Sequence, residues 1–118
     1  MAKHPHPKRW EIWFCHLRSG IAGEPCGDHH VLVLSNPGAR GILLAAPITT
    51  TGRDDDPCVV RIDPADSGLS LVSWIECDQI QALASSPQRF VTFRKRVAES
   101  FRVQVADAIS SALGFDFD

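Results

Sequence analysis

Two apolar runs near the middle of the chain constrain its fold more than any other feature. "HHVLVLSN" (residues 29–36) and "GILLAAPIT" (residues 41–49) both have the length of a β-strand. Between them, "SNPGARG" supplies Asn, Pro and Gly, which are residues that turns favour. The sequence therefore predicts a central β-hairpin.

Shorter segments on either side of this hairpin also have strand character. In "RWEIWFCHL" (residues 9–17) apolar residues alternate, and "CVVRID" (58–63) and "SWIECDQIQAL" (73–83) are two further candidate strands. "TTGRDDDP" and "PADSGLS" separate them as a turn and a connection. "RFVTFRKRV" (89–97) fits either a strand or an extended loop.

The apolar periodicity changes near the C-terminus. From about Ala98 to Leu113 apolar residues recur every three or four positions, which predicts an amphipathic helix, and Gly114 is a natural stop. These residues are Phe101, Val105, Ala108, Ile109, Ala112 and Leu113. Strands followed by one helix, without alternation of the two, predict a mainly β fold of the α+β class. We expect a small, strongly curved antiparallel sheet or barrel with a packed C-terminal helix.

The size of the chain indicates a single domain. With 118 residues, of which 44% are hydrophobic, the chain is long enough for one modest core. Residues 1–8 contain His4-Pro5-His6-Pro7 and predict a flexible leader, which leaves residues 9–118 as the domain. The sequence contains neither a signal peptide nor an apolar run near the ~20 residues of a membrane span. We therefore expect a cytoplasmic protein that does not enter a membrane.

The charge distribution excludes a general attraction to nucleic acid. The formal net charge is −2, so any RNA or DNA site has to be local. Positive charge gathers between residues 89 and 102, and residues 54–56 form an acidic turn. The simplest interpretation of both is a solvated surface.

The cysteines give no recognisable metal or redox motif. Cys15, Cys26, Cys58 and Cys77 are scattered singly, which favours reduced thiols over a zinc ribbon or a dithiol site. A zinc site built from Cys15, His16, Cys26, His29 and His30 stays open as a minor alternative, although the spacings match no standard pattern. We expect neither a metal nor another cofactor.

Four stretches line up, in order and at similar spacing, with motifs of one known family. "KRWEIWFCHL" resembles the opening "RGDIWxVxL" of the MazF/PemK/Kid toxin endoribonucleases, and "GEPCGDHHVLVLSN" resembles their "GSEQxGxRPVLVLSN". "AAPITTTGR" and "CDQIQAL" are similar to their "xAPITS" and "xDQIRTL". The closing "ADAISSALGF" looks like their last helix, "VxxALxxxLGL", so the resemblance spans about residues 8–114.

The resemblance implies both a fold and an activity. The fold is a small SH3-like antiparallel β-barrel of the CcdB/PemK type, which forms a homodimer. The activity is that of the toxin of a type II toxin–antitoxin system, which cleaves single-stranded RNA at a short sequence without a metal ion. The ribose 2′-hydroxyl attacks the adjacent phosphate and leaves 2′,3′-cyclic phosphate and 5′-hydroxyl ends. A cognate antitoxin wraps the dimer and blocks its RNA groove.

Two residues of this sequence take the positions of the family's catalytic pair, the arginine of "RPV" and the threonine of "PIT". Thr49 matches the threonine; its hydroxyl can donate to a phosphate oxygen, or it can simply cap the following turn. The "RP" pair is "HH" here, so His29 takes the arginine position and His30 the proline position. Histidine lacks arginine's permanent charge but transfers protons readily near neutral pH. We expect His29 to act as a general acid or base, and His30 to support the loop and contact the substrate.

The "CDQ" motif supplies two more candidates. Asp78 and Gln79 match the family, and we expect Asp78 to orient a catalytic group or a base edge and Gln79 to contact the substrate. A turn contact is the alternative for Asp78. Two residues before it, where some branches of the family have a second catalytic arginine, this sequence has Glu76.

Two loops are the expected RNA-binding surface. Residues 18–28 contain Glu24, which matches the glutamate of "GSE", and residues 50–57 contain Arg53, a candidate phosphate contact. Each of these side chains can equally be a solvated charge. Neither loop contains an aromatic residue on which a base could stack.

Three other functions stay open from the sequence. The protein could be a family member that has lost cleavage and acts as an RNA- or antitoxin-binding module, because the two arginines are absent. It could be a CcdB-like inhibitor of DNA gyrase, since that class shares the fold. The zinc-binding domain described above is the third.

Overall fold

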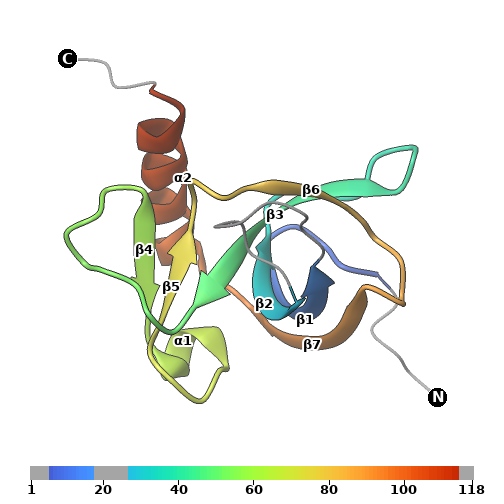
Figure 1. Cartoon of the computed structure of the whole chain (residues 1–118), viewed down its shortest axis with the longest axis horizontal. Helices are drawn as coiled ribbons and strands as arrows, with labels where there is room; N and C mark the ends of the chain where they lie inside the picture. The colour runs from blue at the N-terminus through green and yellow to red at the C-terminus, as the bar shows by residue number, and fades with distance from the viewer. Residues whose placement is uncertain (1–5, 18–26, 115–118) are drawn as a thin grey trace.

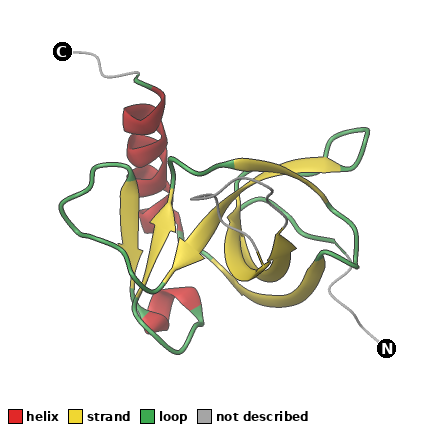
Figure 2. Ribbon diagram, viewed as in Figure 1, coloured by secondary structure: helices red, strands yellow, loops and turns green. Residues whose placement is uncertain are grey.

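The computed structural model describes residues 6–17 and 27–114. Its strands are β1 (Glu11–Leu17), β2 (Gly27–Val33), β3 (Ile42–Thr49), β4 (Val59–Ile62), β5 (Ser73–Glu76), β6 (Gln81–Ala84) and β7 (Phe90–Arg96). Its helices are α1 (Pro64–Ser67) and α2 (Glu99–Leu113). The predicted mainly β fold with a C-terminal helix is confirmed, as Figure 2 shows.

The strands form one antiparallel sheet in the order β4-β5-β3-β2-β1-β7, and β6 pairs with β3 beside this path. The sheet curls strongly: β1, β2 and β7 wrap round at one end, and α2 lies beside β4 and β5 at the other (Figure 1). Within the described residues the two end strands, β4 and β7, do not pair, so the barrel stays open.

The predicted central hairpin is confirmed. β2 and β3 pair in antiparallel register, with Val31 opposite Pro47 and Val33 opposite Ala45. On its other edge β3 pairs with both β5 and β6. β3 is therefore the centre of the sheet.

Residues 31–33 of β2 and 45–48 of β3 are apolar without interruption because both faces of the sheet are buried there. Leu32 and Ile48 belong to one cluster, which includes Val105 of α2; we call this face the helix side. Val31 belongs to a second cluster around Trp13; we call this face the Trp13 side. Because side chains alternate along a strand, neighbouring residues of β2 contribute to different cores.

Helix α2 closes the helix side of the sheet. Val105 and Ala108 are its buried residues, on the apolar stripe that the sequence predicts. The helix ends at Gly114, whose φ of +77° is left-handed and whose N–H donates to the carbonyl of Ser111 at 3.2 Å. The predicted helix and its stop are both confirmed.

The prediction of one strand over residues 73–83 is wrong, because a turn divides it into β5 and β6. Ile75 opposes Ile48, and Gln81 opposes Ala45. From Ile75 to Gln81 the chain advances by twice as many residues as β3 does from Ala45 to Ile48. The extra residues cannot pair with β3, so they form a turn. Residues 89–97, which the sequence left open, form strand β7 paired with β1.

Of the predicted leader, residues 1–5 lie outside the described residues. Pro7 is buried, and the N–H of Lys8 donates to Glu11 Oε1 at 2.7 Å. No helix in the described part of the chain is long and apolar enough to cross a membrane.

A matched pair of substitutions in α2 tests the packing of the helix. Val105 is 0% exposed and Val103 is 66% exposed, two residues apart on the same helix. We expect Val105→Ala to lower the free energy of unfolding by about 2 kcal/mol, since it loses buried methyl groups and leaves a cavity. Val103→Ala should change it by less than about 0.5 kcal/mol. Urea unfolding followed by circular dichroism measures both, and equal effects would contradict the packing.

Candidate functional site

Two of the catalytic candidates, His29 and Thr49, lie where β3 ends and β2 and β5 begin. His30 of β2 lies opposite Ile48 of β3, and Thr49 lies opposite Trp74 of β5. His29 is the next residue on β2, and it continues the same register toward Thr49. By alternation, His29 and Thr49 face the Trp13 side of the sheet, whereas His30 faces the helix side.

Glu76, the last residue of β5, interacts electrostatically with two of the predicted residues. Burial raises the pKa of Glu76, the negative charge of Asp78 raises it further, and the nearby His29 opposes both effects. The structure therefore brings His29 and Asp78 together around a carboxyl group. The sequence analysis noted Glu76 only because it stands where some branches of the family have an arginine. No signal in the sequence indicates that Glu76 lies near His29.

Asp78 and Gln79 belong to the turn between β5 and β6. Asp78 is exposed, and the half-buried Gln79 donates its N–H to the carbonyl oxygen of Glu76 at 3.1 Å. This backbone contact fixes the turn beside the end of β5. Glu24, the other predicted acidic residue, lies outside the described residues.

The hydroxyl of Thr49 caps the turn that follows β3. Thr49 Oγ1 accepts a hydrogen bond from the N–H of Thr51 at 3.2 Å and lies 3.0 Å from Thr51 Oγ1. One of the two hydroxyls donates to the other. The turn cap that the sequence allowed is therefore present, and Thr49 can also bind a phosphate oxygen by turning its proton away from Thr51.

Loop 50–57 is held over the ring of Trp74. A Cβ atom at Gly52 would lie 2.1 Å from Trp74 Cγ, so only glycine fits there. Trp74 Nε1 donates to Asp54 Oδ1 at 2.8 Å. Arg53 pairs with Asp55 at 2.8 Å, but the Arg53 side chain is 78% exposed, and such pairs are weak in water. Its guanidinium can therefore exchange Asp55 for a phosphate.

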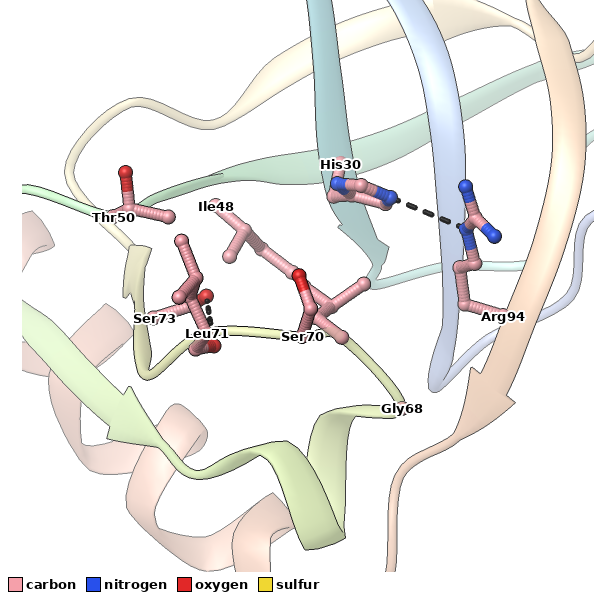
Figure 3. A pocket seen from close by; sticks show the side chains of 9 residues that line it. His30, Ile48, Thr50, Gly68, Ser70, Leu71, Ser73 and Arg94 are labelled. Carbon is pink, nitrogen blue, oxygen red and sulfur yellow. Dashed lines mark hydrogen bonds between the residues drawn. The ribbon is translucent and has the colours of Figure 1, made fainter.

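His30 makes contacts different from those of His29. Arg94 Nε of β7 donates to His30 Nε2 at 3.2 Å, and the Phe14 ring lies 5.2 Å from the His30 ring. Burial lowers the pKa of His30, and the charges of Arg94 and His29 lower it further. Figure 3 shows His30 and Arg94 on the wall of a pocket on the helix side. Sequence analysis missed Arg94, because a cluster of positive charge is usually a solvated surface.

In the described part of the chain, Cys15, Cys77 and the metal-ligating side chains offer no second centre. Burial raises the pKa of Cys15 and of Cys77 to about 12, so both stay protonated and unreactive at neutral pH. Among residues 6–17 and 27–114, no three His, Cys, Asp or Glu side chains converge on a metal position. Cys26, a member of the alternative zinc site, lies outside the described residues.

Comparison with known proteins gives the family. Residues 8–113 match the family model described as the PemK-like, MazF-like toxin of type II toxin–antitoxin systems. This match covers most of the chain, and the protein belongs to this family. No curated protein sequence matches it significantly.

Solved structures with the same fold support the family assignment. MazF from Deinococcus radiodurans superimposes with a TM-score of 0.77 at 19% identity, over 93% of this chain and 98% of that one. The Mycobacterium tuberculosis toxin MazF-mt6 gives 0.72 at 24% identity, over 91% and 99%. A mycobacterial endoribonuclease in complex with its cognate antitoxin gives 0.70 at 24% identity, over 95% and 99%. The predicted fold family is confirmed.

We expect Glu76→Gln to stabilise the protein at neutral pH. The folded protein raises the pKa of this carboxyl above its ordinary value of 4.5, so its protonated form is favoured in the fold. The stability it contributes is full below about pH 4.5 and is lost as the pH rises through the folded pKa. The melting temperature of Glu76→Gln relative to wild type should therefore be higher at about pH 7.5 than at about pH 4.

Thermal unfolding followed by circular dichroism at both pH values measures this difference. Glu99→Gln is the control, because the Glu99 side chain is 88% exposed and its removal should give no such gain with pH. A Glu76→Gln advantage that is equal at the two pH values, or larger at the acidic one, would contradict the raised pKa of the half-buried Glu76 carboxyl.

Proposed function

We propose that the protein is the endoribonuclease toxin of a type II toxin–antitoxin system and cleaves single-stranded mRNA at a short sequence without a metal ion. The ribose 2′-oxygen bonds to the adjacent phosphorus and gives its proton to a base. The bond from phosphorus to the 5′-oxygen breaks, and that oxygen takes a proton from an acid. The products are a 2′,3′-cyclic phosphate and a 5′-hydroxyl.

The family match over residues 8–113 carries this proposal, and the attraction between His29 and Glu76 supplies its acid–base pair. Glu76 acts as the base, because a raised carboxyl pKa brings its basicity closer to neutral pH. His29 in its protonated form is the acid for the 5′-oxygen. The carboxylate and the imidazolium stabilise each other before reaction, and Asp78 tunes the pKa of Glu76.

The other candidates bind the substrate. Thr49 and Arg53 donate to phosphate oxygens as negative charge develops on the phosphate in the transition state. Gln79 and Glu24 contact base edges, which carry the sequence specificity of single-stranded RNA. None of these roles requires a metal ligand.

Family membership supports three further assignments. The partner protein is a cognate antitoxin, as in the mycobacterial and Deinococcus complexes that resemble this chain. The active form is a homodimer, and its location is the cytoplasm, where its mRNA substrate is found. No feature of the described residues favours the gyrase inhibitor or the zinc-binding domain.

The experiment that tests the activity incubates the purified protein with a long single-stranded RNA in EDTA and sequences the fragment ends. Cuts at a shared short motif with 5′-hydroxyl ends would support the proposal. If the folded protein makes no cut across about pH 5–8, the endoribonuclease proposal fails, and a module that only binds RNA or antitoxin remains.

His29→Ala should lower the cleavage rate by about 100-fold or more, because a positioned acid or base contributes at least that much. His6→Ala is the control, since His6 is exposed and lies outside the site. Single-turnover rates across about pH 5–8 should fall toward the alkaline side in the wild type, where a general acid loses its proton, and His29→Ala should lack this fall. A flat wild-type profile would rule out proton transfer by His29.

Thr49→Ala should reduce cleavage strongly while the protein stays folded, and Thr49→Ser should retain most activity because it keeps the hydroxyl. Urea unfolding and RNA cleavage are measured on both variants under the same conditions. If Thr49→Ala loses stability but cleaves normally when folded, its hydroxyl only caps the turn with Thr51.

A further inference from the structure

The pocket beside His30 has no part in the cleavage chemistry described above. Its volume is about 300 Å³, and its wall includes His30, Ile48, Ser70, Leu71 and Arg94, which come from four different segments (Figure 3). That volume is at the small end of ligand sites, which begin at about 300 Å³. We propose that this pocket binds one nucleotide of the single-stranded RNA next to the cleaved bond. The inference rests on the proposed endoribonuclease function.

Arg94 provides the phosphate contact. Its Nε–H can only donate, so His30 Nε2 is the unprotonated nitrogen and the neutral ring carries its proton on Nδ1. This bond fixes the guanidinium plane and leaves its two terminal nitrogens pointing away from His30 (Figure 3). No ion pair among the described residues involves Arg94. A fixed guanidinium fork matches the oxygens of a phosphate.

The His30 ring provides the surface for the base, and Phe14, which lies outside the pocket lining, packs against that ring. Phe14 of β1 lies directly opposite His30 of β2, and the two half-buried rings are tilted by 57°. Single-stranded RNA is generally bound through bases stacked on aromatic side chains. Loop 50–57 has no aromatic residue on which a base could stack, whereas the His30 ring, packed against Phe14, can serve this purpose.

The rest of the wall suits a nucleotide more than a simple anion. Thr50 and Ser70 are exposed at the pocket and carry hydroxyls that can donate to or accept from a base or a ribose. Ile48 and Leu71 add apolar surface. Asp28, the acid two residues before His30 on β2, is already paired with His16, so the Arg94 end of the pocket keeps its positive charge.

The pocket and the cleavage site lie on the two sides of one strand end. His29 and His30 are neighbours on β2, and alternation directs them to opposite faces of the sheet. A single RNA strand that crosses this end places its reacting phosphate at His29 and the adjoining nucleotide at His30. The pocket therefore contributes to substrate binding and specificity rather than to proton transfer.

An NMR titration of the ¹⁵N-labelled protein with each of the four ribonucleoside 5′-monophosphates tests the pocket without requiring cleavage. We expect saturable shifts of the Gly68, Ser70 and Leu71 amides and of Arg94 Nε. Arg94→Gln should weaken this binding about tenfold, as expected for the loss of a charged hydrogen bond. Shifts that are spread over the surface, or unchanged in Arg94→Gln, would overturn the proposal.

Arg96→Gln is the matched control. It makes the same substitution two residues further along β7, where the guanidinium donates to the carbonyl of Arg9 at 3.4 Å, outside the pocket. Its nucleotide affinity should stay within about twofold of wild type. Inorganic phosphate is titrated in parallel. If it binds as tightly as every nucleotide, the pocket is an anion site and the nucleotide assignment is wrong.

Steady-state cleavage separates this inference from the proposed function. Arg94→Gln and Phe14→Leu should raise KM for RNA more than they lower kcat, whereas His29→Ala should lower kcat. Nucleotide binding by a protein that does not cleave RNA would support the pocket and overturn only the endoribonuclease. RNA cleavage by a protein whose pocket binds no nucleotide would overturn only the pocket.

Discussion

The structure depends on one strand, β3, which is paired along both edges and buried on both faces from Ala45 to Ile48. That stretch has to be apolar, because neither set of alternating side chains reaches water there, whereas Ile42 and Leu44 at the start of the strand are exposed. It contains one residue that strands usually avoid, Pro47. Pro47 lies between the β5 ladder, which begins at Ile48, and the β6 ladder, which ends at Ala45. On that edge its missing N–H therefore costs no hydrogen bond.

The same arrangement fixes where chemistry can take place. β2 and β5 begin, and β3 ends, at one edge of the sheet, so polar residues placed just outside the buried core converge there. Trp74 then holds the following loop against this edge through Gly52 and Asp54. Arg53, which belongs to that loop, is thereby brought close to the strand ends without being part of the rigid sheet.

The sequence was most informative where patterns are local and repeated. The 29–49 hairpin and the helix ending at Gly114 follow from apolar runs and spacing, and both are confirmed. The break in residues 73–83 could not be predicted, because it depends on how many residues face β3, a property of pairing rather than of local pattern. The site divides in the same way. Family motifs predicted His29 and Asp78 as candidates, whereas the proximity of Glu76 to His29 and of Arg94 to His30 arises only from folding.

With histidine at position 29, the site has to control a protonation state as well as the position of a side chain. Arginine has its charge fixed, so a site built on it depends on placement alone. In the mechanism that we propose for His29 and Glu76, activity depends on which group holds the proton, and this is set by burial, by Asp78 and by their mutual attraction. His30, one residue away, faces Arg94, whose positive charge favours the neutral ring. Alternation along β2 therefore separates two histidines with opposite requirements: one has to gain a proton, and the other has to remain an acceptor for Arg94.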